Sequence, residues 1–265
     1  MDRIRVVAWN AFREIRHRRI TWLVLGVGVL VTLGLATPIA FFYMARTAGE
    51  TRVADRIGAE LVGAVSGSMA GFASILAFVL GANVISGEMR TRTIVTVLAR
   101  PIERWEWVVG RWLGVQTFAV LVAAVGWVAA AALGWYLGIP LGLAFWMRQL
   151  ERLVEVLFFG TVAVGLSTLL PPTLAGLVAA TLYSLPALVQ QYVGSPVAVQ
   201  RVLASTAYFL GPAQMPDGIV GNVGREVLDP QYGLFAAVLG ENLLYAATLL
   251  LLGCLVFSRR EIRLG

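Results

Sequence analysis

The sequence predicts an all-α integral membrane protein with six transmembrane helices. Of its 265 residues, 58% are hydrophobic and only 14% are charged, and the mean hydropathy is +0.79. A water-soluble domain carries about 25% charged residues, so this apolar excess is too large to be hidden in a single core. Uncharged stretches long enough to cross a bilayer also recur along the chain. These three observations decide the class.

Segments without Asp, Glu or Arg are the ones that a bilayer can hold, because one such charge at its centre costs about 2.5–3.5 kcal/mol. One crossing needs about 20 residues. The long apolar stretch around residue 171 is interrupted by Pro171 and Pro172, where a helix has to stop, so it predicts two spans. The last stretch contains a single charge, Glu241. The predicted spans are 21–45, 61–87, 107–138, 153–170, 173–193 and 232–258.

The arginines predict which side of the membrane holds the termini. An even number of spans places both ends on one side, and 14 of the 21 arginines lie in the segments on that side. The positive-inside rule therefore puts residues 1–20 and the tail 259–265 in the cytoplasm. The largest outer segment is then 194–231, in which residues 197–209 are expected to form a short helix.

Residues 1–20 predict an amphipathic helix at the membrane interface. Its arginines and other polar side chains fall on one arc of a helical wheel, where they can face anionic headgroups. A basic segment that only obeys the positive-inside rule is the alternative. The apolar arc consists of Ile4, Val7, Ala8, Ala11, Phe12 and Ile15.

Several kinds of chemistry are excluded by composition. The chain has no lysine, one histidine (His17) and one cysteine (Cys254). A P-loop needs a lysine, while a zinc site or a Cys/His nucleophile pair needs more of the other two residues. We therefore expect no catalytic, cofactor-binding or metal-binding residue here. No nucleic-acid partner is expected either.

The loop between the second and third spans, residues 88–106, is the most informative segment. Ile94, Val97 and Leu98 recur at helical spacing, which predicts a short helix with one apolar face that ends at Pro101. Charged residues surround this face: Glu88, Arg90, Arg92, Arg100 and Arg104. A helix of this kind suits a groove on a soluble partner, although a solvated connecting loop is the simpler interpretation.

This loop resembles a known family. Glu88, Arg92-Thr93-Ile94, Val97-Leu98, Arg100-Pro101, Arg104 and Gly110-Arg111 resemble the pattern that follows the second helix of ABC-2 type exporter permeases. Residues 8–14 and 257–262 resemble the two ends of such chains. There are two departures from the pattern, since Arg92 stands where many members have glycine and Arg111 where many have lysine.

The resemblance implies a permease that works with a separate P-loop ABC ATPase, which would bind the ATP and Mg²⁺, and with a second permease copy. The fold would be that of a type V exporter in a bacterial or archaeal cytoplasmic membrane, with the substrate path between the two copies. Residues 88–106 would be the coupling helix that docks on the ATPase. Its docking residues would be Glu88, Arg90, Arg92, Thr93, Arg100, Pro101 and Arg104.

Two other functions remain open. An ion-gradient-driven transporter or channel could use Glu155 or Glu241 as its ion site, because intramembrane carboxylates commonly relay ions. Alternatively, Glu155 ends an outer helical turn, and Glu241 either pairs with another helix or lines a path with Asn242 and Tyr245. A membrane anchor that passes ATPase motion to an outer partner is the third function.

The spacing of glycines also predicts close helix contacts. Gly63, Gly67 and Gly71 recur every four residues, which favours either packing within the chain or a dimer interface.

Overall fold

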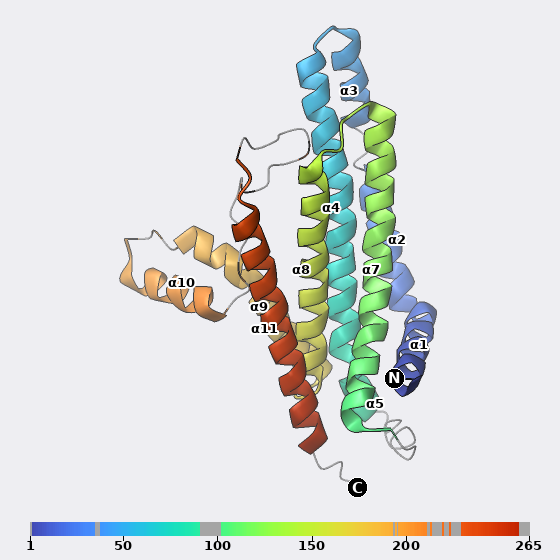
Figure 1. Cartoon of the computed structure of the whole chain (residues 1–265), viewed down its shortest axis with the longest axis vertical. Helices are drawn as coiled ribbons and strands as arrows, with labels where there is room; N and C mark the ends of the chain where they lie inside the picture. Colours follow the sequence, from blue (N-terminus) through green and yellow to red (C-terminus); the bar gives the residue numbers. More distant parts are fainter. Residues whose placement is uncertain are drawn as a thin grey trace.

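The structure is a computed structural model that describes residues 2–34, 38–90, 102–192, 194, 196–210, 213, 219, 223 and 229–259. Within these residues the chain forms helices and no strand. Figure 1 shows an elongated bundle in which both described ends of the chain lie at the same end. That end also holds α5 (Ser86–Arg90), while the turn before α4 (Thr51–Val84) lies at the opposite end.

Three long helices form the centre of the bundle: α4, α7 (Arg104–Leu137) and α8 (Leu143–Ser167). Their facing sides bury small and branched apolar residues, with Leu76, Val115 and Val156 completely enclosed. Gly81 lets α4 approach α8 closely, because a Cβ there would lie 3.1 Å from the carbonyl oxygen of Gly160. Dense packing of this kind fixes how the helices sit against one another.

Helix α1 (Asp2–His17) packs lengthwise against α7. Two glycines of α7 make the approach possible: a Cβ at Gly110 would lie 2.7 Å from Cβ of Val7, and one at Gly114 would lie 2.5 Å from Cβ of Ala11. Val7, Ala11 and Ile15 are buried in this contact. The apolar arc expected for residues 1–20 therefore faces protein.

At the end away from the termini, α3 (Pro38–Thr47) folds back on the start of α4. Gly49 has a φ of 80° in the turn between them, a left-handed conformation that glycine adopts readily. Phe42 of α3 is buried beside Gly58 of α4. Before α3, α2 (Arg19–Gly34) lies on the outside of the bundle and exposes most of its apolar side chains, among them Trp22, Leu23, Leu30 and Leu33.

Helix α11 (Tyr232–Arg259) crosses α8 at a pair of facing glycines. A Cβ at Gly253 would lie 3.1 Å from Cα of Gly165, so neither position has room for a larger side chain. Helices α9 (Pro172–Tyr192) and α10 (Ala198–Leu210) form a hairpin that projects sideways past α11 (Figure 1). Helix α10 coincides with the short helix expected at 197–209 to within one residue at each end.

Four segments among the described residues are long and apolar enough to cross a membrane: Thr21–Thr47, Thr51–Met89, Arg104–Leu137 and Tyr232–Arg259. Helix α8 is not among them because its first half carries four charges, from Arg148 to Glu155. The six-span count therefore stays a prediction.

The central helices are also longer than the predicted spans. Helix α4 begins at Thr51 where the span was expected to begin at residue 61, and α8 begins at Leu143 rather than 153. With 34 residues, α4 is about 50 Å long, against a hydrocarbon thickness of about 30 Å.

Candidate functional site

An ion-pair network with a buried centre joins three elements at the end of the bundle that holds the termini. The Glu88 carboxylate of α5 pairs with the Arg111 guanidinium of α7, and both side chains are about nine-tenths buried. Arg111 Nη1 also donates to Oε2 of Glu14 in α1 at 2.6 Å. Glu14 in turn accepts a hydrogen bond from Arg18. Arg111 therefore links the start of the 88–106 segment to α7 and to α1.

The network also changes the acidity of Glu14. Burial by itself would raise the pKa of this carboxyl group. The hydrogen bonds and positive charges of Arg18 and Arg111 act in the opposite direction and prevail, so the pKa of Glu14 lies below its ordinary value. Glu14 is therefore held as a carboxylate at neutral pH, which is the form that Arg111 requires.

Aromatic packing continues the network toward α11. Arg111 lies over the ring of Trp107, with Cζ 5.8 Å from the ring centroid. Trp107 is 1% exposed and stacks on Phe257 of α11, with the two ring centroids 5.4 Å apart. One turn earlier, Arg104 Nη1 donates to the carbonyl oxygen of Ser258 at 3.4 Å. The beginning of α7 is thus attached to the end of α11.

The first turn of α7 is closed by its own acidic residues. The backbone N–H of Glu103 donates to Oε2 of Glu106 at 3.0 Å, and the indole N–H of Trp105 donates to the Glu103 carboxylate. Carboxylates near a helix N-terminus satisfy its unpaired N–H groups and favour its dipole. Helix α7 therefore has a well-defined start where it leaves the 88–106 segment.

The structure describes both ends of the predicted coupling segment. Glu88 is buried in α5, whose last residue is Arg90, and Arg104 begins α7. The other predicted docking residues, Arg92, Thr93, Arg100 and Pro101, lie outside the described residues. The expected short helix with its apolar face falls on the same residues.

The predicted path residues lie together on the upper half of α11 but have different surroundings. Glu241 is exposed. The Asn242 side-chain amide donates to the carbonyl oxygen of Ala213 at 3.0 Å. Tyr245 stacks on Phe158 of α8, with centroids 5.5 Å apart. Asn242 and Tyr245 thus contact the chain itself, and Glu241 faces outward.

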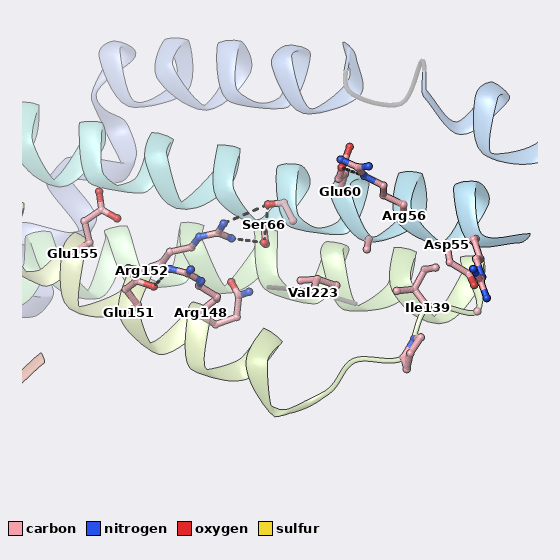
Figure 2. A pocket seen from close by; sticks show the side chains of 16 residues that line it. Asp55, Arg56, Glu60, Ser66, Ile139, Arg148, Glu151, Arg152, Glu155 and Val223 are labelled. Atoms are coloured by element: carbon pink, nitrogen blue, oxygen red, sulfur yellow. Dashed lines mark hydrogen bonds and ion pairs between the residues drawn. The ribbon is translucent and has the colours of Figure 1, made fainter. Parts of the chain in front are cut away.

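Glu155, the other predicted ion-site residue, lines a cavity of about 710 Å³ between α4 and α8 near the opposite end of the bundle. Arg152 and Ser66 line the same cavity (Figure 2). Among the described residues, no group of three or more histidine, cysteine or acidic residues is placed to hold a metal ion.

Residues 5–262 match the family model of the ABC-2 family transporter proteins. The chain belongs to this family. A comparison with proteins of curated function finds no match. As an ABC-2 family protein, the chain is a multi-pass membrane transport subunit, which explains its apolar helices.

Within this ABC-2 protein, Arg111 has a structural role that its place in the sequence pattern did not reveal. Its partner Glu14 is 97 residues away along the chain, and no short motif connects the two. Gly110 and Gly114, which admit α1, were likewise not recognised, although their four-residue spacing is typical of close helix contacts. Glycines at this spacing, in a chain that also has an amphipathic helix, were a signal from which the contact with α1 could have been predicted.

Proposed function

We propose that this chain is the permease subunit of an ATP-binding cassette transporter, driven by ATP that a separate nucleotide-binding subunit hydrolyses. Residues 88–106 would dock on that subunit and receive its motion. One observation carries the proposal: both described ends of this segment are bonded into the bundle, through Glu88 to Arg111 and through Arg104 to Ser258. Because both ends of the segment are bonded to the bundle, a displacement of the segment by the ATPase would be transmitted to the helices.

Three helices would move with the segment. Arg111 belongs to α7 and holds Glu14 of α1 at 2.6 Å, so α1 and α7 are connected to α5 through one guanidinium. Arg104 and the Trp107–Phe257 stack connect α7 to α11. Coupling over such distances requires rigid elements with two arrangements, and packed helices joined by ion pairs are such elements.

A second permease copy would complete the transporter, with the substrate path between the two copies and the cargo moved outward. Supporting this, α2 and α11 expose apolar side chains such as Leu30 and Leu244 over much of their length. Glu241 is exposed on α11, and no other charged residue occurs in this helix before Arg259. A carboxylate in hydrocarbon needs a polar neighbour, which another copy or a polar path would supply.

The direct test is the ATPase activity of the assembled complex. The chain is co-expressed with an ABC ATPase encoded beside it, purified as a complex, and assayed for ATP hydrolysis in lipid nanodiscs. Glu88→Ala and Arg100→Glu should each lower substrate-stimulated hydrolysis several-fold, while the permease remains folded and in the membrane. The control Arg201→Glu, on exposed α10, should leave hydrolysis unchanged. Unchanged turnover in both test variants, or no complex at all, would contradict the proposal.

The ion-driven alternative has one supporting observation. Glu155 lines the cavity beside Arg152, and among the described residues its carboxylate has no hydrogen bond or ion pair. The alternative predicts substrate uptake into liposomes that contain the permease alone and a proton or sodium gradient. Uptake that the Glu155→Gln variant abolishes would favour it over the ATP-driven function.

A further inference from the structure

The cavity near the α3–α4 end of the bundle has features of a ligand site. Its volume of about 710 Å³ is in the range of pockets that hold small molecules. It is lined by four arginines and four acidic residues, which are Arg52, Arg56, Arg148, Arg152, Asp55, Glu60, Glu151 and Glu155. The lining charges therefore cancel.

Two pairs of these charges satisfy one another. Arg56 Nε lies 3.1 Å from Oε1 of Glu60 at the exposed rim, and Arg148 Nη1 lies 2.7 Å from Oε2 of Glu151. Figure 2 shows the first pair on α4 and the second on α8. Four lining charges remain: Arg52 and Asp55, which are exposed, and Arg152 and Glu155, which lie deeper. The two deeper charges define what the cavity can recognise.

Arg152 is fixed by α4 and still has donors to offer. Its guanidinium donates to Oγ of Ser66 and, at 3.4 Å, to the carbonyl oxygen of Gly63. Guanidinium has five N–H groups. The described residues accept hydrogen bonds from two of them, so three remain for a ligand. Gly67 makes room for the group, because a Cβ there would lie 3.0 Å from Nη2.

An unsatisfied acceptor lines the same cavity. Gln149 is 3% exposed and its side-chain N–H donates to the carbonyl oxygen of Phe145 at 3.2 Å. Its Oε1 has no hydrogen-bond partner among the described residues. A buried acceptor without a partner is unfavourable, so this wall of the cavity gains from any rearrangement that brings a donor to Gln149.

We propose that this cavity binds a zwitterion whose acid group pairs with Arg152 and whose primary ammonium pairs with Glu155. Residues 152 and 155 are three positions apart on α8, which places them on the same face of the helix, and both side chains line the cavity. Aminoalkyl phosphates and amino acids are small ligands that carry both charges. A pure anion would meet the repulsion of Glu155, and a pure cation that of Arg152. The proposal goes beyond ATP-driven transport and does not depend on it.

The test is equilibrium binding to the purified permease alone, in a neutral maltoside detergent and without ATP or an ATPase. The probe is radiolabelled phosphoethanolamine. We expect saturable binding, and we expect phosphocholine to compete at least about tenfold more weakly, because its quaternary ammonium has no N–H to donate. Inorganic phosphate and ethanolamine, which each carry one of the two charges, should also compete poorly.

Variants locate the site. Arg152→Gln and Glu155→Gln should each weaken binding about tenfold or more, whereas Arg201→Gln and Glu50→Gln, at exposed positions outside the cavity, should not. Gly67→Val should also weaken binding, because it displaces the guanidinium without changing any charge. If Arg152→Gln does not yield monodisperse protein, the site is tested by measuring binding to the Gly67→Val and Glu155→Gln variants.

A further comparison identifies the source of the ligand. Competition by phosphatidylethanolamine in mixed micelles at lower concentration than phosphoethanolamine indicates a lipid headgroup, and the reverse order indicates a soluble zwitterion. Both outcomes support the site. Absence of saturable binding, equal competition by phosphocholine, or binding that none of the cavity variants affects would overturn it. The binding assay contains no ATPase. A negative result therefore contradicts only the ligand site, and failure to form a complex with the ATPase contradicts only the proposed transport function.

Discussion

At the scale of single residues, Arg111 connects three helices, a role that no sequence motif indicated. It binds Glu88 and Glu14 and covers the ring of Trp107. A lysine in its place would offer one ammonium, whereas arginine has a planar fork with several donors. Arginine therefore suits a position between two carboxylates.

A double-mutant cycle tests this pairing. Arg111→Gln leaves the buried Glu88 carboxylate without this partner and should destabilise the folded protein by about 3–5 kcal/mol. Glu88→Gln should cost less, because Arg111 keeps Glu14. The double variant should be clearly more stable than the sum of the two losses predicts, as measured by unfolding in mixed micelles. Additive losses would show that the two side chains do not interact.

The depressed pKa of Glu14 predicts an acid dependence. A carboxyl group whose pKa is lower in the folded state contributes stability above its unfolded pKa, near 4.3, and that stability is lost as the pH falls through the folded pKa. Unfolding midpoints of the wild type should therefore fall more steeply below about pH 4 than those of Glu14→Gln. Parallel curves would contradict the interaction with Arg18 and Arg111.

At the scale of helices, close approach depends on glycine at a few positions. Gly110 and Gly114 admit α1, Gly165 and Gly253 allow α8 and α11 to cross, and Gly67 accommodates Arg152. Within the described part of the chain, the regular stripe of Gly63, Gly67 and Gly71 thus does not pack as one surface, since no described atom lies within 4 Å of a Cβ placed at Gly63 or Gly71.

Gly114→Ala tests the docking of α1. The added methyl would lie 2.8 Å from the backbone oxygen of Ala8, and backbone cannot move aside as a flexible side chain can. The cost should be about 1–3 kcal/mol, measured as a lower unfolding midpoint in detergent. The matched control Gly71→Ala, in α4, should be neutral or stabilising because it meets open space and raises helix propensity. Equal behaviour of the two variants would refute the close approach.

The sequence predicted the helical class and the positions of the apolar segments, because hydropathy is a local property. It did not predict where α4 and α8 begin. Both helices continue about ten residues beyond the apolar stretch into charged sequence, where Arg56–Glu60 and Arg148–Glu151 pair at helical spacing. The contacts of Arg111 and Arg152 depend on residues distant in sequence, so no local pattern contains them.

At the scale of the whole molecule, the two ends of the bundle have different chemistry. One end holds the termini, α5 and the ion-pair network around Arg111, and the other holds the cavity around Arg152 (Figures 1 and 2). This difference between the two ends suits a protein that binds a motor subunit at one membrane face and a ligand near the other.

Labelling of single cysteines tests this arrangement across the membrane. In a Cys254→Ser background, Arg52→Cys should react with a membrane-impermeant maleimide in intact cells, because the α3–α4 end is expected outside. Arg18→Cys should react only after permeabilisation. Equal labelling of both, or the reverse pattern, would contradict the proposed orientation.

Cross-linking between the 88–106 segment and the ATPase measures the coupling most directly. In the same background, Thr96→Cys and Arg52→Cys are each treated with a short bifunctional reagent in membranes that contain both subunits. We predict a permease–ATPase conjugate with Thr96→Cys, at a yield that changes when a non-hydrolysable ATP analogue is added, and none with Arg52→Cys. A conjugate formed only from position 52, or a residue 96 that reacts with impermeant reagents from outside intact cells, would contradict the proposal.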